Sequence, residues 1–396
     1  MTTTATSCGA TNRPRLIVVS YLAHAPFAPR GIRTRELVVP LLQNWSVELV
    51  AGSAVPAANS RRSQDGRSFV RRTLHLTHSS ILLDRFEPWS VRRFFSWRPQ
   101  AAGALLIGFP FSPIAYAARR LAAVRIPYVV DIGDPWVLTA ERPVVRNLAR
   151  VRAKRAEHRL WAGASGVVVT TQAQAQSLGE LFPKLPMLVR PNGLPLENEA
   201  RLQADVQRRK SHSGSVLRLV HFGDLSSARL DIVPFLTSLD RAGVWEQVEF
   251  HQYGSDWTGK LSETGAVRAV FHEPRAWEEI IRIASNYDLA IVVGNRDWKQ
   301  LPSKAVAYLQ LPVPRLAVVG DAETDALANY VKDKAAWLTL NAGANDAARQ
   351  IEGHLSRRWS VGDLTPPVTE SWERISEDVA DFVYGVLRTD GDARRS

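Results

Sequence analysis

The chain contains 396 residues, of which 45% are apolar and 22% are charged. That length exceeds what one hydrophobic core usually serves and suits two domains of ordinary size. Its one cysteine, Cys8, excludes an internal disulfide framework and a cysteine-based zinc site. The best candidate for a membrane span, residues 103–118, is interrupted by Pro110 and Pro113, so it falls short of the roughly 18 residues that cross a bilayer. Residues 1–12 lack the basic start and apolar centre of a signal peptide, so we expect a cytoplasmic protein.

The net charge of +11 is unevenly divided along the chain. Residues 1–200 carry 26 lysines and arginines against 12 acidic residues, a net +14, whereas the remainder carries 24 against 27, a net −3. A basic half joined to a nearly neutral half indicates that the first half faces an anionic partner. That partner would be a phospholipid surface, a phosphorylated acceptor or a nucleic acid.

Short apolar runs rich in β-branched residues alternate with helical patterns along most of the chain. This alternation predicts parallel sheets with helices on both faces, and therefore an α/β fold with two Rossmann-like, doubly wound domains that face each other across a cleft. The strands expected in the first domain are 15–20, 46–51, 103–108, 127–131, 166–171 and 186–190; those expected in the second are 216–221, 248–253, 267–271, 287–293, 315–319 and 336–340.

The remaining segments set the expected domain boundaries. We expect a first domain over residues 1–200 with an irregular insert at about 53–101, a polar linker over 196–215, and a second domain over 216–365. A helix over 366–387, with apolar residues on one side, is expected to pack back across the domain junction, and a polar tail follows over 388–396.

One segment near the end of the chain, residues 301–312 (LPSKAVAYLQLP), has the pattern of an anion site. Pro302 suits a helix entry, Ser303 has a side chain that can cap the helix, and Lys304 would stand beside the positive end of the helix dipole. The preceding strand is predicted to be buried and parallel, so this loop lies at the carboxyl edge of the sheet, where ligands usually bind. A nucleoside diphosphate is the natural candidate, and a plain helix start with a solvated lysine is the alternative.

Further segments, in order and spacing, resemble the GT-B glycosyltransferases, in particular the retaining, family-four-like branch (glycosyl transferases group 1 type). The segments that carry the resemblance are the loop 23–35 with Pro29-Arg30-Gly31, the run Asp131-Ile132-Gly133-Asp134-Pro135-Trp136, the turn Arg190-Pro191-Asn192-Gly193, the strand end His221-Phe222-Gly223-Asp224, and the Pro-Ser-Lys segment with Tyr308. The resemblance implies transfer of a sugar, with retained configuration, from a nucleotide donor to a glycan, lipid-linked or secondary-metabolite acceptor. It implies no cofactor and no metal, because fixed cations and backbone N–H groups stabilise the leaving phosphates.

The resemblance also assigns donor-binding residues. Arg229, six positions after Gly223, stands where similar enzymes place a phosphate-binding lysine, so with Lys304 it would form a clamp of two cations. Gly31 would let the backbone approach the donor phosphate beside Arg33. A solvated Arg229, a plain loop glycine and a packed Tyr253 are the alternatives. The other expected donor contacts are Gly223, Asp224, Tyr253, Gly254, Pro302, Ser303 and Tyr308.

Candidate catalytic residues come from the first domain. Asp131 and Asp134 follow a predicted strand and would bind acceptor hydroxyls or position the incoming nucleophile, and His24 could act from the first loop. The structural alternative is a turn in which the Asp134 carboxylate accepts from backbone N–H groups. The chain lacks a G-x-G-x-x-G pattern after its first strand and a P-loop, which disfavours a dinucleotide dehydrogenase and an ATPase.

Two positions depart from the family pattern. Relatives usually have a glutamate three residues after the lysine, where its carboxylate takes the ribose hydroxyls, and this chain has Ala307. Asp224 stands where many relatives have arginine. These changes imply altered donor contacts, a divergent donor or lost activity, so a catalytically inactive GT-B-like partner protein stays open.

Basic residues also recur along one predicted helix. Arg142, Arg146, Arg150, Lys154 and His158 are spaced every four residues and would form one stripe, and an anionic partner would relieve their repulsion. We expect Arg146, Arg150 and Lys154 to contact an anionic membrane surface or a lipid-linked acceptor, with a solvated helix as the alternative. A nucleic-acid-binding protein is suggested by charge alone, and because no RNA or DNA motif accompanies the charge we expect no nucleic-acid partner.

Overall fold

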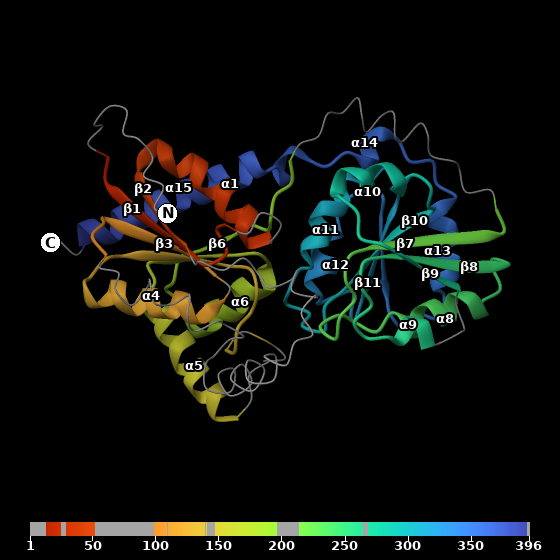
Figure 1. Ribbon diagram of the computed structural model, residues 1–396, viewed down its shortest axis with the longest axis horizontal. Coiled ribbons are helices and arrows are strands. Elements are labelled where there is room, and N and C mark those ends of the chain that lie inside the picture. Colours follow the sequence, from red (N-terminus) through yellow and green to blue (C-terminus); the bar gives the residue numbers. More distant parts are fainter. Residues whose placement is uncertain are drawn as a thin grey trace, which may run out of the picture.

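The computed structural model describes residues 13–24, 29–51, 99–108, 110–138, 140, 147–195, 214–263 and 268–393. Within these ranges the chain forms two parallel sheets of six strands each, side by side in Figure 1, with helices on the faces of each sheet. The predicted α/β fold with two Rossmann-like domains is therefore confirmed. The predicted insert over 53–101 falls almost entirely outside the described residues, and so does most of the predicted linker over 196–215.

The first sheet has the strand order β2-β1-β3-β4-β5-β6. Its strands are β1 (Arg15–Ser20), β2 (Ser46–Ala51), β3 (Gly103–Ile107), β4 (Tyr128–Ile132), β5 (Gly166–Val169) and β6 (Met187–Val189). All these strands are parallel, so the loops after β1 and β3 lie at the same carboxyl edge. The connections that follow β1 and β3 run toward opposite sides of the sheet, and this arrangement leaves a crevice at that edge. Helices α1 (Pro29–Asn44), α4 (Phe111–Ala123), α5 (Asn147–Ala162) and α6 (Gln172–Leu181) connect the strands.

The second sheet has the order β12-β11-β10-β7-β8-β9. Its strands are β7 (Val216–Phe222), β8 (Gln247–Tyr253), β9 (Arg268–His272), β10 (Leu289–Val293), β11 (Arg315–Val319) and β12 (Trp337–Asn341). Two apolar clusters, one on each face, bury β10 completely and β7 over its last four residues, which is the reason β10 reads as a continuous apolar run. The helical elements of this half are α8 (Val233–Arg241), α9 (Lys260–Glu263), α10 (Trp277–Ala284), α11 (Ser303–Ala307), η3 (Tyr308–Gln310), α12 (Ala326–Val331), α13 (Ala347–Leu355), α14 (Val361–Leu364) and η4 (Val368–Glu370).

The last helix, α15 (Trp372–Ala393), belongs to the first domain. It starts at the junction, where the Leu194 N–H donates to the Glu370 carbonyl and the Trp372 N–H donates to the Leu194 carbonyl, both at 3.0 Å. It then runs across the first sheet beside α1 (Figure 1) and inserts Val379, Val383 and other apolar side chains into the core that also holds β1. The first domain is thus built from both ends of the chain.

Among the described residues, no helix combines the length and the apolar character that a membrane span requires.

Candidate functional site

A cavity of about 260 Å³ lies between the carboxyl edges of the two sheets. Both domains supply its walls, which is the position expected for a ligand of doubly wound sheets. The first domain contributes Leu22, Pro29, Arg30, Gly133, Asp134, Thr170 and Asn192; the second contributes Arg229, Asn295, Gln300, Leu301, Pro302, Ser303 and Val306.

Lys304 packs against the end of β7, beside this cavity. A Cβ atom on Gly223 would lie 1.2 Å from the Lys304 Nζ, so the ammonium occupies space that only a glycine leaves open. Gly223 also has a φ of +121°, a conformation that favours glycine for its own backbone. Among the described residues, the Lys304 ammonium has no hydrogen bond and no ion pair within 4 Å. Within the part of the chain that the structure describes, it is therefore a cation without a directly bonded anionic partner.

The electrostatic surroundings make that cation unusual. The pKa of Lys304 is lowered to about 8, mainly by burial and also by the neighbouring positive charge of Arg229, whereas the charge of Asp224 opposes this change. Because the charge of Arg229 acts on Lys304, and both charges act on the buried His221, the two cations lie near each other in the second domain. Like charges at close range in a partly buried setting favour a bound anion, because the anion relieves their repulsion.

Arg229 is held in place by the loop that follows β10. Its Nη1 donates to the Asn295 Oδ1 at 2.6 Å, and the backbones of these two residues form an isolated antiparallel bridge. The Asn295 Nδ2 in turn donates to the Gln300 carbonyl at 2.9 Å, which fixes the loop on itself. Burial lowers the pKa of Arg229, and Asp134 across the cavity opposes this shift. Asn295 therefore orients the guanidinium that lines the cavity.

His221 is buried at the end of β7 close to both cations. Its Nδ1 lies 2.9 Å from the Ile291 carbonyl, so this nitrogen carries the proton and donates, and the Nε2 has no hydrogen-bond partner among the described residues. Burial lowers the pKa of His221 to about 3, and the charge of Lys304 contributes to the same shift. The ring is accordingly neutral near pH 7 and does not add a third positive charge.

Asp224 and Gly254 shape the loops beside Lys304. The Asp224 Oδ1 accepts from the Ser255 N–H at 2.8 Å, which ties the loop after β7 to the loop after β8. Gly254 has a φ of +121°, and a Cβ there would lie 2.8 Å from the backbone of Gly223. The two loops can pass so closely only because both positions are glycine. Asp224 thus links two loops and also raises the pKa of Lys304.

The two predicted donor-binding tyrosines are packed inside the second domain. Tyr253 stacks on His272 with ring centroids 4.2 Å apart, and its hydroxyl lies 2.8 Å from that of Tyr287. Tyr308 is fully buried, and its hydroxyl accepts from the Phe222 N–H at 2.6 Å. Neither side chain lines the cavity. In this packing Tyr253 corresponds to the packed tyrosine of the alternative, and Tyr308 fixes the end of β7. Donor contact by either residue stays a prediction.

The start of α11 also differs from expectation. The helix begins at Ser303 itself after Pro302, with no side-chain cap, and continues for only five residues before η3. Ser303 is therefore a cavity-lining residue and not a helix cap. A helix this short has a small dipole, so the attraction for an anion must come mainly from the side chains of Lys304 and Arg229.

In the first domain, Arg33 and Asp131 form a fully buried ion pair. The Arg33 Nε lies 2.8 Å and 2.9 Å from the two Asp131 oxygens, and the Nη1 and Nη2 donate to the carbonyls of Pro191 and Arg190. Neither side chain lines the cavity. Both side chains are enclosed and already paired, and the pair fastens α1 to β4 and to the turn after β6. Donor binding by Arg33 and catalysis by Asp131 stay predictions.

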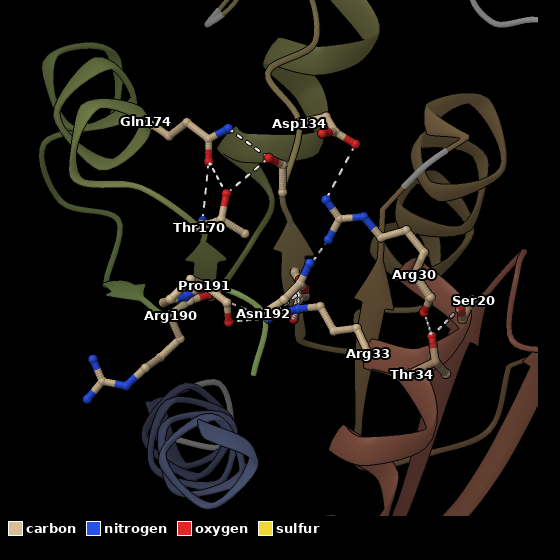
Figure 2. Close-up of polar contacts among 12 residues, drawn as sticks. Ser20, Arg30, Arg33, Thr34, Asp134, Thr170, Gln174, Arg190, Pro191 and Asn192 are labelled. Carbon is tan, nitrogen blue, oxygen red and sulfur yellow. Dashed lines mark hydrogen bonds and ion pairs between the residues drawn. The ribbon is translucent and has the colours of Figure 1, made fainter. Parts of the chain in front are cut away.

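Asp134 occupies a different position, because it reaches the cavity and is partly exposed. Its Oδ1 accepts from the Gln300 Nε2 of the second domain, and its Oδ2 lies 3.4 Å from the Arg30 Nη2 of the first. Figure 2 shows Arg30 pointing toward Asp134 from the start of α1. Asp134 thus links the two domains through its side chain. Sequence patterns did not single out Gln300 or Asn295, and their only sequence signal is a polar loop after a buried strand.

The remaining predicted residues lie elsewhere. Gly31 is buried in the first turn of α1, and His24 is exposed in the turn after β1 and does not line the cavity. Arg150 and Lys154 are exposed on α5, and Arg146 lies outside the described residues. Among the residues that the structure describes, no three His, Cys, Asp or Glu side chains gather closely enough to bind a metal ion.

No protein-family model and no curated protein sequence matches this chain. Its structure does match solved structures at low sequence identity. The lipopolysaccharide outer core galactosyltransferase WaaB, in its apo form, matches with a TM-score of 0.59 and 10% identity, over 94% of this chain and 99% of WaaB. HepE of Anabaena in complex with UDP-glucose matches with a TM-score of 0.54 and 14% identity, over 97% of this chain and 100% of HepE. Sucrose-phosphate synthase of Thermosynechococcus elongatus matches with a TM-score of 0.54 and 12% identity, over 97% and 98% of the two chains. The chain therefore has the GT-B fold.

Proposed function

We propose that this protein is a glycosyltransferase that moves a sugar from a nucleotide donor to a glycan, lipid-linked or secondary-metabolite acceptor with retention of configuration. The observation that carries the proposal is the placement of Lys304. Its ammonium sits against Gly223 at the carboxyl edge of the second sheet, next to Arg229, without a hydrogen bond or ion pair among the described residues. A nucleoside diphosphate is an anion of suitable size and charge for such a pair of cations.

The chemistry follows from where charge develops. Breaking the bond between the anomeric carbon and the diphosphate leaves negative charge on the phosphate oxygens, and Lys304 and Arg229 stabilise that charge more strongly as it grows. In this proposal the two side chains do this without a metal. Asp134 lines the opposite wall, and its carboxylate is placed to accept a hydrogen bond from an acceptor hydroxyl once Gln300 releases it.

The structural neighbours support the same class of donor. HepE was solved with UDP-glucose, and WaaB is a galactosyltransferase. Both span nearly the whole of this chain, so the resemblance includes the edge of the second sheet where Lys304 lies. This likeness supports a nucleotide-sugar donor. Binding experiments with different nucleotide sugars will identify its base and its sugar.

A binding and hydrolysis experiment tests the proposal. Thermal melting with UDP, GDP, ADP and dTDP sugars should reveal one donor that raises the melting temperature, because a ligand of the folded form stabilises it. The pure protein should then hydrolyse that donor slowly, and Lys304→Ala should abolish hydrolysis without unfolding. Lys332→Ala, which removes an exposed lysine of the same domain, is the matched control. Binding without hydrolysis or transfer would favour the inactive partner protein that Ala307 and Asp224 keep open, and no binding at all would refute the proposal.

We further propose that α5 brings the protein to an anionic membrane on the inner face of the cell, where a lipid-linked acceptor is collected. This helix exposes five cations, and its one acidic residue, Glu157, is buried and accepts from the N–H groups of Val137 and Leu138. It projects from the first domain in Figure 1. The exposed cations are Arg150, Arg152, Lys154, Arg155 and Arg159.

Binding to vesicles tests this contact. Each basic residue near an anionic surface contributes about 1 kcal/mol, so Arg150→Glu with Lys154→Glu should weaken binding to vesicles that contain phosphatidylserine by at least tenfold. Arg241→Glu with Lys332→Glu makes the same change in net charge on the second domain and should have little effect. Equal losses for both pairs would show that net charge, and not α5, governs the attraction.

A further inference from the structure

We propose that Arg30 supplies a third cationic contact to the donor diphosphate, from the first domain, so that the anion is held from both sides of the cleft. This inference rests on the proposed function and adds to it a residue that sequence patterns single out only as part of the Pro29-Arg30-Gly31 segment. Arg30 follows Pro29 in the first turn of α1, and both residues line the cavity.

The guanidinium of Arg30 is buried but incompletely paired. The whole residue is 9% exposed, and the Nη1 has no hydrogen-bond partner among the described residues. The nearest carboxylate oxygens lie 3.4 Å from the Nη2, at Asp134, and 3.9 Å from the Nη1, at Asp131. A buried N–H group without a partner is costly, so such a group at a cavity wall points to a ligand that completes it.

The pairing of Arg33 explains why the Arg30 guanidinium can still bind an anion. Arg33 takes both oxygens of Asp131 at 2.8 Å and 2.9 Å, so the charge of that carboxylate is already matched. Arg30 is left with the long contact to Asp134, whose other oxygen is held by Gln300. Two arginines close in sequence therefore differ in role: Arg33 is fully paired within the fold, whereas Arg30, a residue of the cavity lining, retains a buried N–H group without a hydrogen-bond partner among the described residues.

The backbone beneath Arg30 fixes its direction. A Cβ atom at Gly133 would lie 1.7 Å from the Arg30 Nη2 and 2.5 Å from its Cζ, so the guanidinium rests directly on the Gly133 backbone. Figure 2 shows the side chain extended from α1 toward the loop after β4. A larger residue at position 133 would push it away. This arrangement holds Arg30 at the wall of a cavity that Arg229 lines from the opposite domain.

The size of the cavity selects the ligand group. A space of about 260 Å³ is small, so an anion inside it contacts walls of both domains, and a diphosphate there lies between Arg30 and Arg229. Arginine binds phosphate oxygens through charge-assisted hydrogen bonds, which are roughly twice as strong as neutral ones. Donor binding should consequently draw the two domains together.

Calorimetry with nucleoside diphosphates tests the assignment. In Arg30→Met the dissociation constant for the diphosphate that the wild type binds should rise at least tenfold. The dissociation constant for the corresponding monophosphate should rise by a smaller factor. Arg30→Lys should recover part of the affinity, and Arg35→Met, which removes an exposed charge from the same helix, should stay within about threefold of wild type. Small-angle X-ray scattering should show compaction by the diphosphate in the wild type but less in Arg30→Met.

The outcomes separate this inference from the proposed function. If Lys304→Ala loses the diphosphate and Arg30→Met binds it normally with normal compaction, Arg30 does not contact the anion and only this inference fails. If the wild type binds no nucleoside diphosphate, the proposed function fails first. Thermal melting of Arg30→Met checks its folding, and Arg30→Lys keeps the test decisive if the methionine variant is unstable.

Discussion

Replacing Gly223 by alanine tests the placement of Lys304 without touching the lysine itself. The added Cβ would meet the Nζ at 1.2 Å and the Cε at 2.1 Å. Because a lysine end is flexible and the β7 backbone is not, the ammonium should move. The φ of +121° at this position adds backbone strain of roughly 1–3 kcal/mol for a residue with a Cβ.

Two magnitudes follow from that geometry. The strain should lower the melting temperature by several degrees, since 1 kcal/mol corresponds to about 2–4 °C for a domain of this size. Displacement of the ammonium should remove a charge-assisted contact worth about 1.5–3 kcal/mol, so affinity for a nucleoside diphosphate should fall about tenfold to 150-fold. Because both effects act on one contact, Gly223→Ala combined with Lys304→Ala should bind about as weakly as Lys304→Ala alone.

Calorimetry on the four proteins of this cycle, with thermal melting of each, is the assay. Gly243→Ala is the matched control, because Gly243 has a φ of +66° and a Cβ there would meet nothing within 4 Å. That variant should lose stability and keep its affinity. Wild-type affinity in Gly223→Ala, or losses that add in the double variant, would refute the idea that Gly223 exists to seat the ammonium.

Three further predictions concern charge and the cleft. Lys304 carries its proton below its lowered pKa of about 8, so diphosphate affinity should fall as pH rises through that value, and Lys304→Ala should flatten the profile; a profile that Lys304→Ala leaves unchanged would assign the titration to another group. The pKa of Asp325 is raised to about 6 by burial, so the native state binds more protons than the unfolded state between about pH 4 and 6, and stability should decline as the pH rises through that range. Asp325→Asn, which keeps an N-cap residue on α12, should remove this decline in urea titrations at each pH. If the decline persisted in that variant, Asp325 would be excluded as its source. Gln300→Glu places a second carboxylate against Asp134, so scattering should show a more open protein at pH 7 than for Gln300→Ala, and identical profiles would mean that this contact does not hold the domains together.

Strand positions were readable from sequence because parallel strands buried on both faces require continuous apolar runs. Segment 315–319 lies between two other strands of its sheet, and its predicted and observed bounds coincide. The charged residues were harder to place, because their roles depend on neighbours distant in sequence. Arg33 meets Asp131 and Pro191 only after folding, so no local pattern distinguishes it from Arg30.

The polar residues of the site were likewise hard to predict where their partners are distant in sequence. Lys304 was found through its place after a buried strand and a proline, and that signal is local. Gln300 and Asn295 act through hydrogen bonds to Asp134 and Arg229, which lie far away in the chain. Tyr308 resembled a ligand residue because it follows the lysine, but the helix turns its hydroxyl inward to the end of β7.

The return of α15 to the first sheet has a consequence for biosynthesis. Leu16 and Val18, near the start of the chain, share a core with Val383 and Leu387, near its end. During synthesis the second domain is therefore made before the first one can close, and strand β1 lacks part of its core until α15 has been made. A nonsense mutation before Trp372 would leave one face of that sheet uncovered and should yield an aggregation-prone product that retains an intact second domain.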